Sequence, residues 1–258
     1  MFERKKPIFT KGRILKNEML ENMRDFPKNI TDILLANHSD GVIVGLDLSV
    51  DDHDITISPG IVNDKGEILV LNEALKIPYV ATGGEQILKL QFEDAYQTKD
   101  FEGRMVNVVL ESVATKAEEM ELARFRLSQG AYLRLNYQDF EDFKTGHNTL
   151  NIVNQPYSSI SGQTLSPVIL KYFARELLTY KTENPHDLAV VYQVLNKEVS
   201  ISKELLANYI KIRLKEEHAN VQNNDDLHKG LTHILKQAKR EQRGSGKALS
   251  GSRKLIVD

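Results

Sequence analysis

The stretch DGVIVGLDLSVDDHDITISPGIVNDKGEILVL, residues 40–71, is the most regularly patterned part of the chain. Its apolar residues alternate with polar ones, as at Leu46, Leu48 and Val50, which is the period of a strand with one buried face. Glycines and short polar runs separate the alternating segments. The pattern therefore predicts several short antiparallel strands joined by tight turns.

The alternation continues beyond this stretch, in QILKLQF at 86–92, in 106–110 and again at Leu133 and Leu135. Between the first strands, NDKG at 63–66 predicts a turn in which Gly66 takes a positive φ. Strands at such short and regular spacing are typical of an antiparallel sandwich or barrel, which we expect over residues 41–140.

The segment before these strands, residues 1–40, is expected to be helical in part. RILKNEMLENMRDF at 13–26 places Leu15, Met19 and Met23 at four-residue spacing on one helix face. Pro27 predicts a break, after which KNITDILLAN forms a second short helix. The apolar face suits either a cap packed on the next domain or a helix that docks on a partner.

The second half of the chain changes from strand to helix patterns. Residues 141–164 are rich in Asn, Ser, Thr and Gly, which predicts a linker or long loop. Residues 165–243 carry helix-start signals at Ser166-Pro167 and Asn184-Pro185, with Ser202 and either Asn224 or Asp225 as further caps. Four amphipathic helices are enough for a small bundle.

We therefore predict an α+β protein with strands and helices in separate parts. The expected domains are an N-terminal helical segment (1–40), a β-sandwich or barrel (41–140), a linker (141–164), a helical domain (165–243) and a flexible basic tail (244–258).

The composition excludes several classes of site. The chain has 258 residues, a net charge of −2 and no cysteine, so disulfides and Cys-ligated metal sites are excluded. No apolar run reaches the roughly 20 residues that span a bilayer. The basic N-terminus has no apolar stretch behind it, which predicts synthesis and folding in a bacterial cytoplasm rather than secretion.

No motif predicts a catalytic residue, a metal site or a cofactor. GSGK at 244–247 resembles a phosphate-binding loop, but Glu241 and Ala248 stand where that loop needs a glycine and a hydroxyl. No two of the seven histidines have the spacing that places two ligands on one helix face, so we expect all of them at the surface or half-buried.

The basic tail has three possible roles. From Lys236 onward the chain has seven Lys or Arg residues against Glu241 and Asp258. Such a run can be a solvated tail or can hold phosphate backbones. Alternatively RKLIVD, whose docking residues would be Arg253, Lys254, Leu255, Ile256 and Val257, adds a strand to the sheet edge of a neighbouring subunit.

The segment GVIVGLDLSV…ITISPGIVNDKGEILVL resembles a module of phage tail and baseplate proteins that also occurs in contractile injection systems. In that module a strand with the pattern GVVxGLxV is followed by a short hairpin. A segment with the pattern hxVxPGxAhDxxGxxI comes next, where h is an apolar residue and x is any residue. The matching turn and scaffold positions here are Gly41, Gly45, Leu46, Ser58, Pro59, Gly60, Asp64 and Gly66. ELARFRLSQGAYLR at 121–134 is similar to the strand that often closes the module. The usual LHGPGVV lead-in is replaced by LLANHSDGVI, and the helical half matches no family.

The resemblance implies a structural component of a phage tail or tail-like baseplate, which holds neighbouring subunits or attaches a receptor-binding fibre and does no catalysis. It would be assembled into a virion or tail-like particle, with copies of itself, of which a trimer is one form, and other tail or baseplate proteins as partners. No membrane contact and no cofactor are expected, and nucleic acid is not the favoured partner. Two other hypotheses remain: a nucleic-acid-associated protein that uses the basic tail, and an enzyme whose carboxylates form no recognisable motif.

Overall fold

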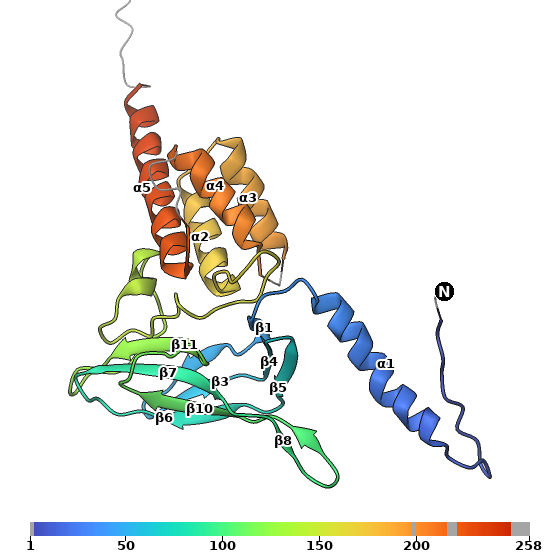
Figure 1. The fold of residues 1–258 in the computed structure, drawn as a ribbon. Helices are drawn as coiled ribbons and strands as arrows, with labels where there is room; N and C mark the ends of the chain where they lie inside the picture. The colour runs from blue at the N-terminus through green and yellow to red at the C-terminus, as the bar shows by residue number, and fades with distance from the viewer. Residues whose placement is uncertain (1–2, 198–199, 216–220, 249–258) are drawn as a thin grey trace, which may run out of the picture. The chain divides into compact units, whose positions relative to one another are not determined.

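The structure is a computed structural model, and it describes residues 3–197, 200–215 and 221–248. The chain divides into two compact units, residues 1–38 and residues 39–258. Figure 1 shows one long helix in the first unit, and sheets followed by a group of helices in the second. The predicted α+β layout, with an N-terminal helix, antiparallel sheets and C-terminal helices, is confirmed.

The first unit contains a single helix, α1 (Asn17–Leu35), which runs through Pro27. The predicted break at this proline is therefore wrong. A proline inside a helix removes one backbone hydrogen bond, but its fixed φ is itself helical. The next turn carries compensating contacts, since the Thr31 hydroxyl donates to the Pro27 carbonyl at 3.0 Å and Lys28 pairs with Asp32 at 2.7 Å. Leu15 lies before the helix begins.

The second unit begins with three antiparallel sheets of three strands each. The first sheet has the strand order β1 (Gly41–Gly45), β4 (Gly60–Asp64), β5 (Glu67–Leu71). The second sheet has the order β2 (Leu48–Val50), β3 (Asp54–Ile57), β6 (Leu75–Pro78). The third sheet has the order β10 (Val106–Glu111), β7 (Glu85–Phe92), β11 (Glu119–Arg126). A two-stranded hairpin, β8 (Tyr96–Gln97) and β9 (Glu102–Gly103), extends from the third sheet (Figure 1).

The strand expected at Leu133 and Leu135 is not present. Arg134 forms one isolated parallel bridge with Thr149, and no strand extends on either side of it. An ion pair holds this segment instead, because the Arg134 guanidinium lies 2.7 Å from the Asp142 carboxylate. Leu133 is nonetheless buried. The apolar residue that suggested a strand therefore packs in the core without belonging to a strand.

Residues 141–164 are irregular apart from a short 3-10 helix, η1 (Glu141–Lys144), but they are not a solvated spacer. Most of residues 149–159 are buried, including Leu150, Val153 and Tyr157. Their polar side chains make hydrogen bonds inside the fold, as Asn151 does with the backbone N–H of Val153 at 2.9 Å. Residues 141–164 thus have a composition typical of loops, although most of residues 149–159 pack inside the fold.

Four helices follow: α2 (Pro167–Thr179), α3 (Pro185–Asn196), α4 (Lys203–Leu214) and α5 (Asn224–Ala248). The predicted caps Ser166 and Asn184 are confirmed, since each side chain accepts a hydrogen bond from the backbone two residues on. Ser202 stands at the N-cap of α4, but its side chain makes no capping bond to the helix backbone. The cap of α5 is Asn223, whose side chain accepts from the N–H of Asp226 at 2.9 Å, rather than either predicted residue.

The helix α5 extends through Ala248, so the first five residues of the expected tail continue the helix. The remaining tail, including Arg253, Lys254, Leu255, Ile256 and Val257, lies outside the described residues.

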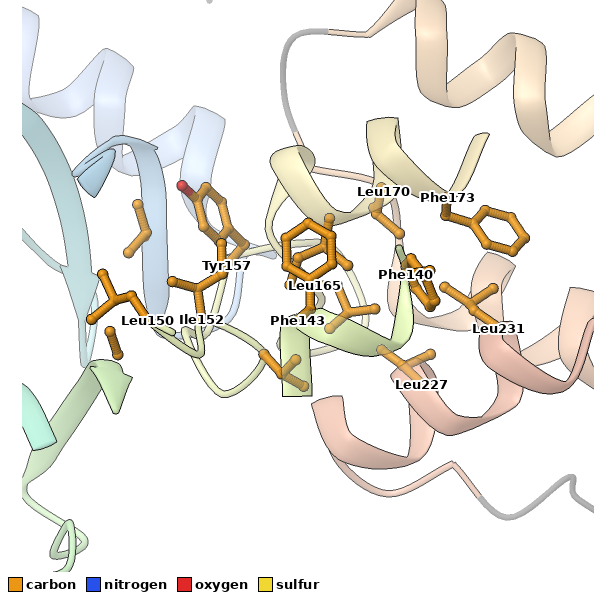
Figure 2. Close-up of a cluster of buried hydrophobic side chains, with 14 of the residues drawn as sticks. Phe140, Phe143, Leu150, Ile152, Tyr157, Leu165, Leu170, Phe173, Leu227 and Leu231 are labelled. Carbon is orange, nitrogen blue, oxygen red and sulfur yellow. The ribbon is translucent and has the colours of Figure 1, made fainter. Parts of the chain in front are cut away.

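One continuous core joins the sheets to the helices (Figure 2). On the sheet side it contains Leu150, Ile152 and Tyr157, and on the helix side Phe173 and Leu231. Phe140 lies between η1 and the helices and stacks on the imidazole of His228 at a centroid distance of 4.5 Å. The sheets and the helices therefore share their apolar interior.

A buried charge network ties three of the helices together. The Asp187 carboxylate of α3 is fully buried and lies 2.8 Å from both the Tyr209 hydroxyl and Nε of Arg213, on α4. Arg213 also reaches Glu241 of α5 at 3.1 Å. A buried ion of this kind is tolerated only when its partners are in place, so the network specifies how the three helices pack.

A second buried cation lies in the third sheet. Lys89 of the central strand β7 has no exposed side-chain area, and its Nζ lies 2.6 Å from Glu111 and 2.7 Å from Glu119 on the two flanking strands. Burial alone would lower the pKa of Lys89, but the two carboxylates outweigh it and raise that pKa. Its hydrogen bond to Glu119, aided by the N–H of Lys116, lowers the pKa of the Glu119 carboxyl.

The Lys89 network makes stability depend on pH. Because the pKa of Glu119 is below its ordinary 4.5 in the folded state, the stabilisation is present above pH 4.5 and is lost as the pH falls through the folded pKa. We expect urea unfolding at pH 7, 5, 4 and 3 to show a smaller acid-dependent loss of stability in Lys89→Met than in the wild type. Lys89→Met should also be less stable at pH 7, because two carboxylates lose their cation.

Lys99→Met, which changes an exposed lysine, is the matched control and should follow the wild-type pH profile. An unchanged acid slope in Lys89→Met would contradict the assignment of this pH dependence to the network.

Candidate assembly surfaces

Three of the predicted scaffold residues, together with Leu46, meet at one crossing of β1 and β4. Gly45, which ends β1, is the register partner of Gly60, which begins β4 directly after Pro59. A Cβ added to Gly45 would lie 2.1 Å from the Pro59 carbonyl oxygen. A Cβ added to Gly60 would lie 2.5 Å from the backbone nitrogen of Leu46. The two backbones are in contact, so neither position has room for a side chain.

Gly41, at the other end of β1, also lets two backbones lie in contact, here those of β1 and residues 156–158. Its φ is 140°, and an added Cβ would lie 2.7 Å from the carbonyl oxygen of Pro156. The glycine lets residues 156–158 pair with β1: the Val42 N–H donates to Pro156, and the Ser158 N–H donates to the Val42 carbonyl, both at 2.8 Å.

Leu46, directly after the crossing, has a left-handed backbone with φ of 53°. This conformation costs a non-glycine residue about 1–2 kcal/mol. Its side chain is 2% exposed, and its carbonyl accepts a hydrogen bond from the Gln155 amide at 3.3 Å. Burial of the side chain therefore offsets the backbone strain.

Asp64 and Gly66 lie at the β4–β5 hairpin. Lys65 and Gly66 both have positive φ, which is the pattern of a two-residue type I′ turn, and nothing lies within 4 Å of a Cβ added to Gly66. Asp64 pairs with Arg104 at 2.6 Å, and Glu67 lies 3.2 Å from the same guanidinium. Burial alone would lower the pKa of Arg104, but these carboxylates outweigh it and raise that pKa.

The residues that hold the crossing in place from outside were not predicted. Tyr157 donates from its hydroxyl to the Gly45 carbonyl at 3.2 Å, and Ser158 donates to the Ser39 carbonyl at 2.6 Å. The Asn224 amide, at the start of α5, donates to the carbonyls of both Gln155 and Thr164 at 3.1 Å. Their partners lie 60–119 residues away, so only the signal of a polar loop was visible in the sequence.

The first exposed surface of the chain is an apolar stripe on α1. We define the α1 stripe as Met19, Met23, Phe26, Ile30 and Ile33, which follow one another at spacings of four, three, four and three residues. No residue of α1 is buried, and Ile33 is 77% exposed. Leu20 and Leu34 widen the stripe along one side and are also exposed.

The second exposed surface is an apolar groove between two sheets. We define the β5–β10 groove as a cavity of about 370 Å³ whose walls are β5 and β10. Its lining also includes Leu46, Ile57, Val62, Leu90 and Arg104. Arg104 is the only charged residue among those that line it within the described chain, so the groove suits an apolar occupant.

A third depression, of about 510 Å³, lies between α2, α5 and η1 and is lined mostly by residues with polar or charged groups. Its most enclosed carboxylate, Glu176, already accepts from the Phe140 N–H at 3.0 Å and from the Tyr180 hydroxyl at 2.8 Å. Burial, together with Glu176, raises the pKa of Tyr180 to about 12. One oxygen of Glu176 thus joins η1 to α2, and the other bonds to the residue that caps the end of α2.

Of the six histidines among the described residues, one departs from the prediction that all seven are exposed or half-buried, and His218 lies outside the described residues. His228 is 2% exposed, and its Nε2 lies 2.9 Å from the carbonyl oxygen of Phe140. Since a carbonyl oxygen only accepts, Nε2 carries the proton, and burial lowers the pKa of the ring. His228 is therefore a neutral residue of the core.

The described residues contain neither a candidate metal cluster nor a candidate membrane-spanning helix. No cluster of three or more His, Asp or Glu side chains there could hold a metal ion. Among the described helices, none combines the length and the apolar character that crossing a bilayer requires.

No protein-family model matches the chain, and no curated protein matches it. The crystal structure of TssK is similar at 11% sequence identity and a TM-score of 0.44, over 93% of this chain and 72% of that chain. In the cryo-electron microscopy structure of the type VI secretion system TssK–TssF–TssG baseplate subcomplex, a chain is similar at 11% identity and a TM-score of 0.42, over 91% of this chain and 100% of that chain. A likeness this distant assigns neither a family nor a function.

Gly60, in strand β4, and Gly66, in the β4–β5 turn, should respond differently to substitution. Gly60→Ala places a methyl group against the backbone of Leu46, so the crossing must shift, at a cost of about 3 kcal/mol. Gly66→Ala meets no atom and loses only the left-handed preference of glycine, about 1 kcal/mol. The free energies of unfolding in urea measure both, and equal losses would contradict the close contact at Gly60.

Proposed function

We propose that the protein is a structural subunit of a phage-tail-like or baseplate assembly, which associates with copies of itself through α1 and holds neighbouring subunits at fixed positions. It has no catalytic role in this proposal. The helix stripe is the single observation that carries it, and the geometry of the glycine crossing supports it.

The spacing of the α1 stripe is that of a coiled-coil seam. Positions separated alternately by four and three residues repeat every 3.5 residues, which is the period at which supercoiled helices meet. Met23 and Ile30 take one core position, while Met19, Phe26 and Ile33 take the other. A helix that exposes four of these side chains, leaves Met19 half-buried and buries none within its own chain needs a second surface to cover them.

The composition of the seam favours more than two helices. Leu20 and Leu34 stand beside the core positions where a two-stranded coiled coil usually carries charges, and both are exposed. A third helix covers these flanking leucines, whereas a two-stranded seam leaves them in water. The proposed assembly is therefore a parallel trimer, which is a closed symmetric form.

The glycine crossing supplies the rigidity that a structural subunit requires. Gly41, Gly45 and Gly60 bring three backbone segments into direct contact, and these are residues that the resemblance to tail and baseplate modules places in its pattern. Segments held by backbone contact leave little freedom to the loops that present a binding surface. The remaining partners in this proposal are other tail or baseplate proteins that contact these sheets.

Self-association through α1 is tested by the mass of the full chain in solution. Light scattering of the wild type should give a trimer, and Met23→Glu with Ile30→Glu should give a monomer, because two charges would enter the seam. Since α1 contributes nothing to the buried core, the melting temperature of the second unit should not change.

The matched control is Arg24→Glu with Lys28→Glu, which places the same two glutamates on the polar face of α1. It should keep the mass of the wild type. A wild-type monomer at every concentration, or equal dissociation in both double variants, would rule out the seam.

A further inference from the structure

We propose that the β5–β10 groove of one copy receives residues 253–257, RKLIV, from a neighbouring copy as an added strand. The sequence alone suggested that this segment adds a strand to a sheet edge of a neighbouring subunit, but it did not identify that edge. The groove supplies the site, and the inference stands apart from the seam on α1.

Both walls of the groove are the edge strands of their sheets. In the described part of the chain, β5 pairs only with β4, and β10 pairs only with β7. Each wall therefore offers a row of backbone N–H and C=O groups on its outer side, and added strands bind through such groups. Apolar edge strands left open in this way also promote aggregation, so a dedicated occupant removes a liability.

The groove and the segment match in chemistry. Val62 and Leu90 lie in the groove lining with the apolar residues of β5, and Val106 and Val108 line it from β10. Leu255, Ile256 and Val257 are the residue types that favour strands and bury apolar area. A strand of this composition would cover the lining with its inward side chains and pair with an edge through its backbone.

Two carboxylates on the walls of the groove stand outside its lining, in which Arg104 is the charged residue. Glu67 begins β5 and is paired with Arg104, and Glu111 ends β10 and is paired with Lys89; their side chains are 57% and 36% exposed. Arg253 and Lys254 directly precede the apolar residues, and in this proposal they approach these exposed carboxylates outside the lining. Such pairs add modest affinity and strong salt dependence.

The reach of the chain favours a neighbouring copy as the donor. The start of α5 lies near the groove, since Asn224 bonds to Gln155, which in turn bonds to Leu46 in the groove lining. Figure 1 shows α5 running away from the sheets, and its 25 residues extend about 36 Å at ~1.5 Å per residue. The seven residues from Ala248 to Leu255 span at most about 25 Å. The segment is thus too short to return to its own groove.

Binding of a labelled peptide tests the site directly. The peptide is LSGSRKLIVD, residues 249–258, and the receptor is the full chain carrying Ile256→Lys to disable its own segment. The receptor also carries Met23→Glu and Ile30→Glu, so that failure of the α1 seam cannot affect the result. Fluorescence anisotropy should show saturable binding that weakens as salt is raised.

Two groove variants of this receptor should bind at least about tenfold more weakly, because each adds a cation facing Arg253 and Lys254. Val70→Lys changes a groove residue that is 55% exposed and so leaves the core intact, and Val106→Lys changes the start of β10. The control Val80→Lys changes an exposed valine outside the groove and should bind as before.

A peptide carrying Ile256→Lys should not bind to any receptor. Absence of saturable binding, or equal binding by Val70→Lys and Val80→Lys, would overturn the proposal. Thermal melting of each receptor shows whether it is folded, and Val70→Lys alone decides the outcome if Val106→Lys is not.

Discussion

The backbone pairing of Val42 with Pro156 and Ser158 is the constraint on which the rest of the second unit depends. It joins the first strand of the sheets to a segment that precedes the helices, through two hydrogen bonds of 2.8 Å. The pairing is possible because Gly41 has no side chain where the Pro156 carbonyl approaches. The same segment then bonds to Asn224 at the start of α5, so one short stretch of backbone sets the position of sheets and helices together.

Buried ion pairs, like this backbone contact, fix how the strands and helices pack. Lys89 joins the three strands of its sheet, and Asp187 joins α3 to α4 and, through Arg213, to α5. Each buried ion is costly unless its partners are in place, so alternative packings that separate them are disfavoured. Nothing in the sequence distinguishes these two residues from exposed charges, because their partners are up to 30 residues away along the chain, as Glu119 is from Lys89.

The two exposed apolar surfaces are the features on which the proposed assembly rests. The α1 stripe belongs to a helix that buries no residue of its own, and the β5–β10 groove lies between two edge strands. The sequence alone predicts the first of these surfaces but not the second. The stripe follows from residue spacing along one helix, whereas the groove brings together β5 and β10, whose pairing partners and order no local pattern specifies.

The sequence by itself determined the features whose partners lie within a few residues. These are the alternating strands, the positive φ of Gly66, the caps at Ser166 and Asn184 and the apolar face of α1, and each depends on local geometry or on short-range hydrogen bonds. Tertiary structure alone decided that Gly41, Gly45 and Gly60 serve close backbone contact, and that the polar loop around Tyr157 is buried. The physical reason is that these depend on atoms brought together from distant parts of the chain, and residue type specifies such contacts only once the fold has formed.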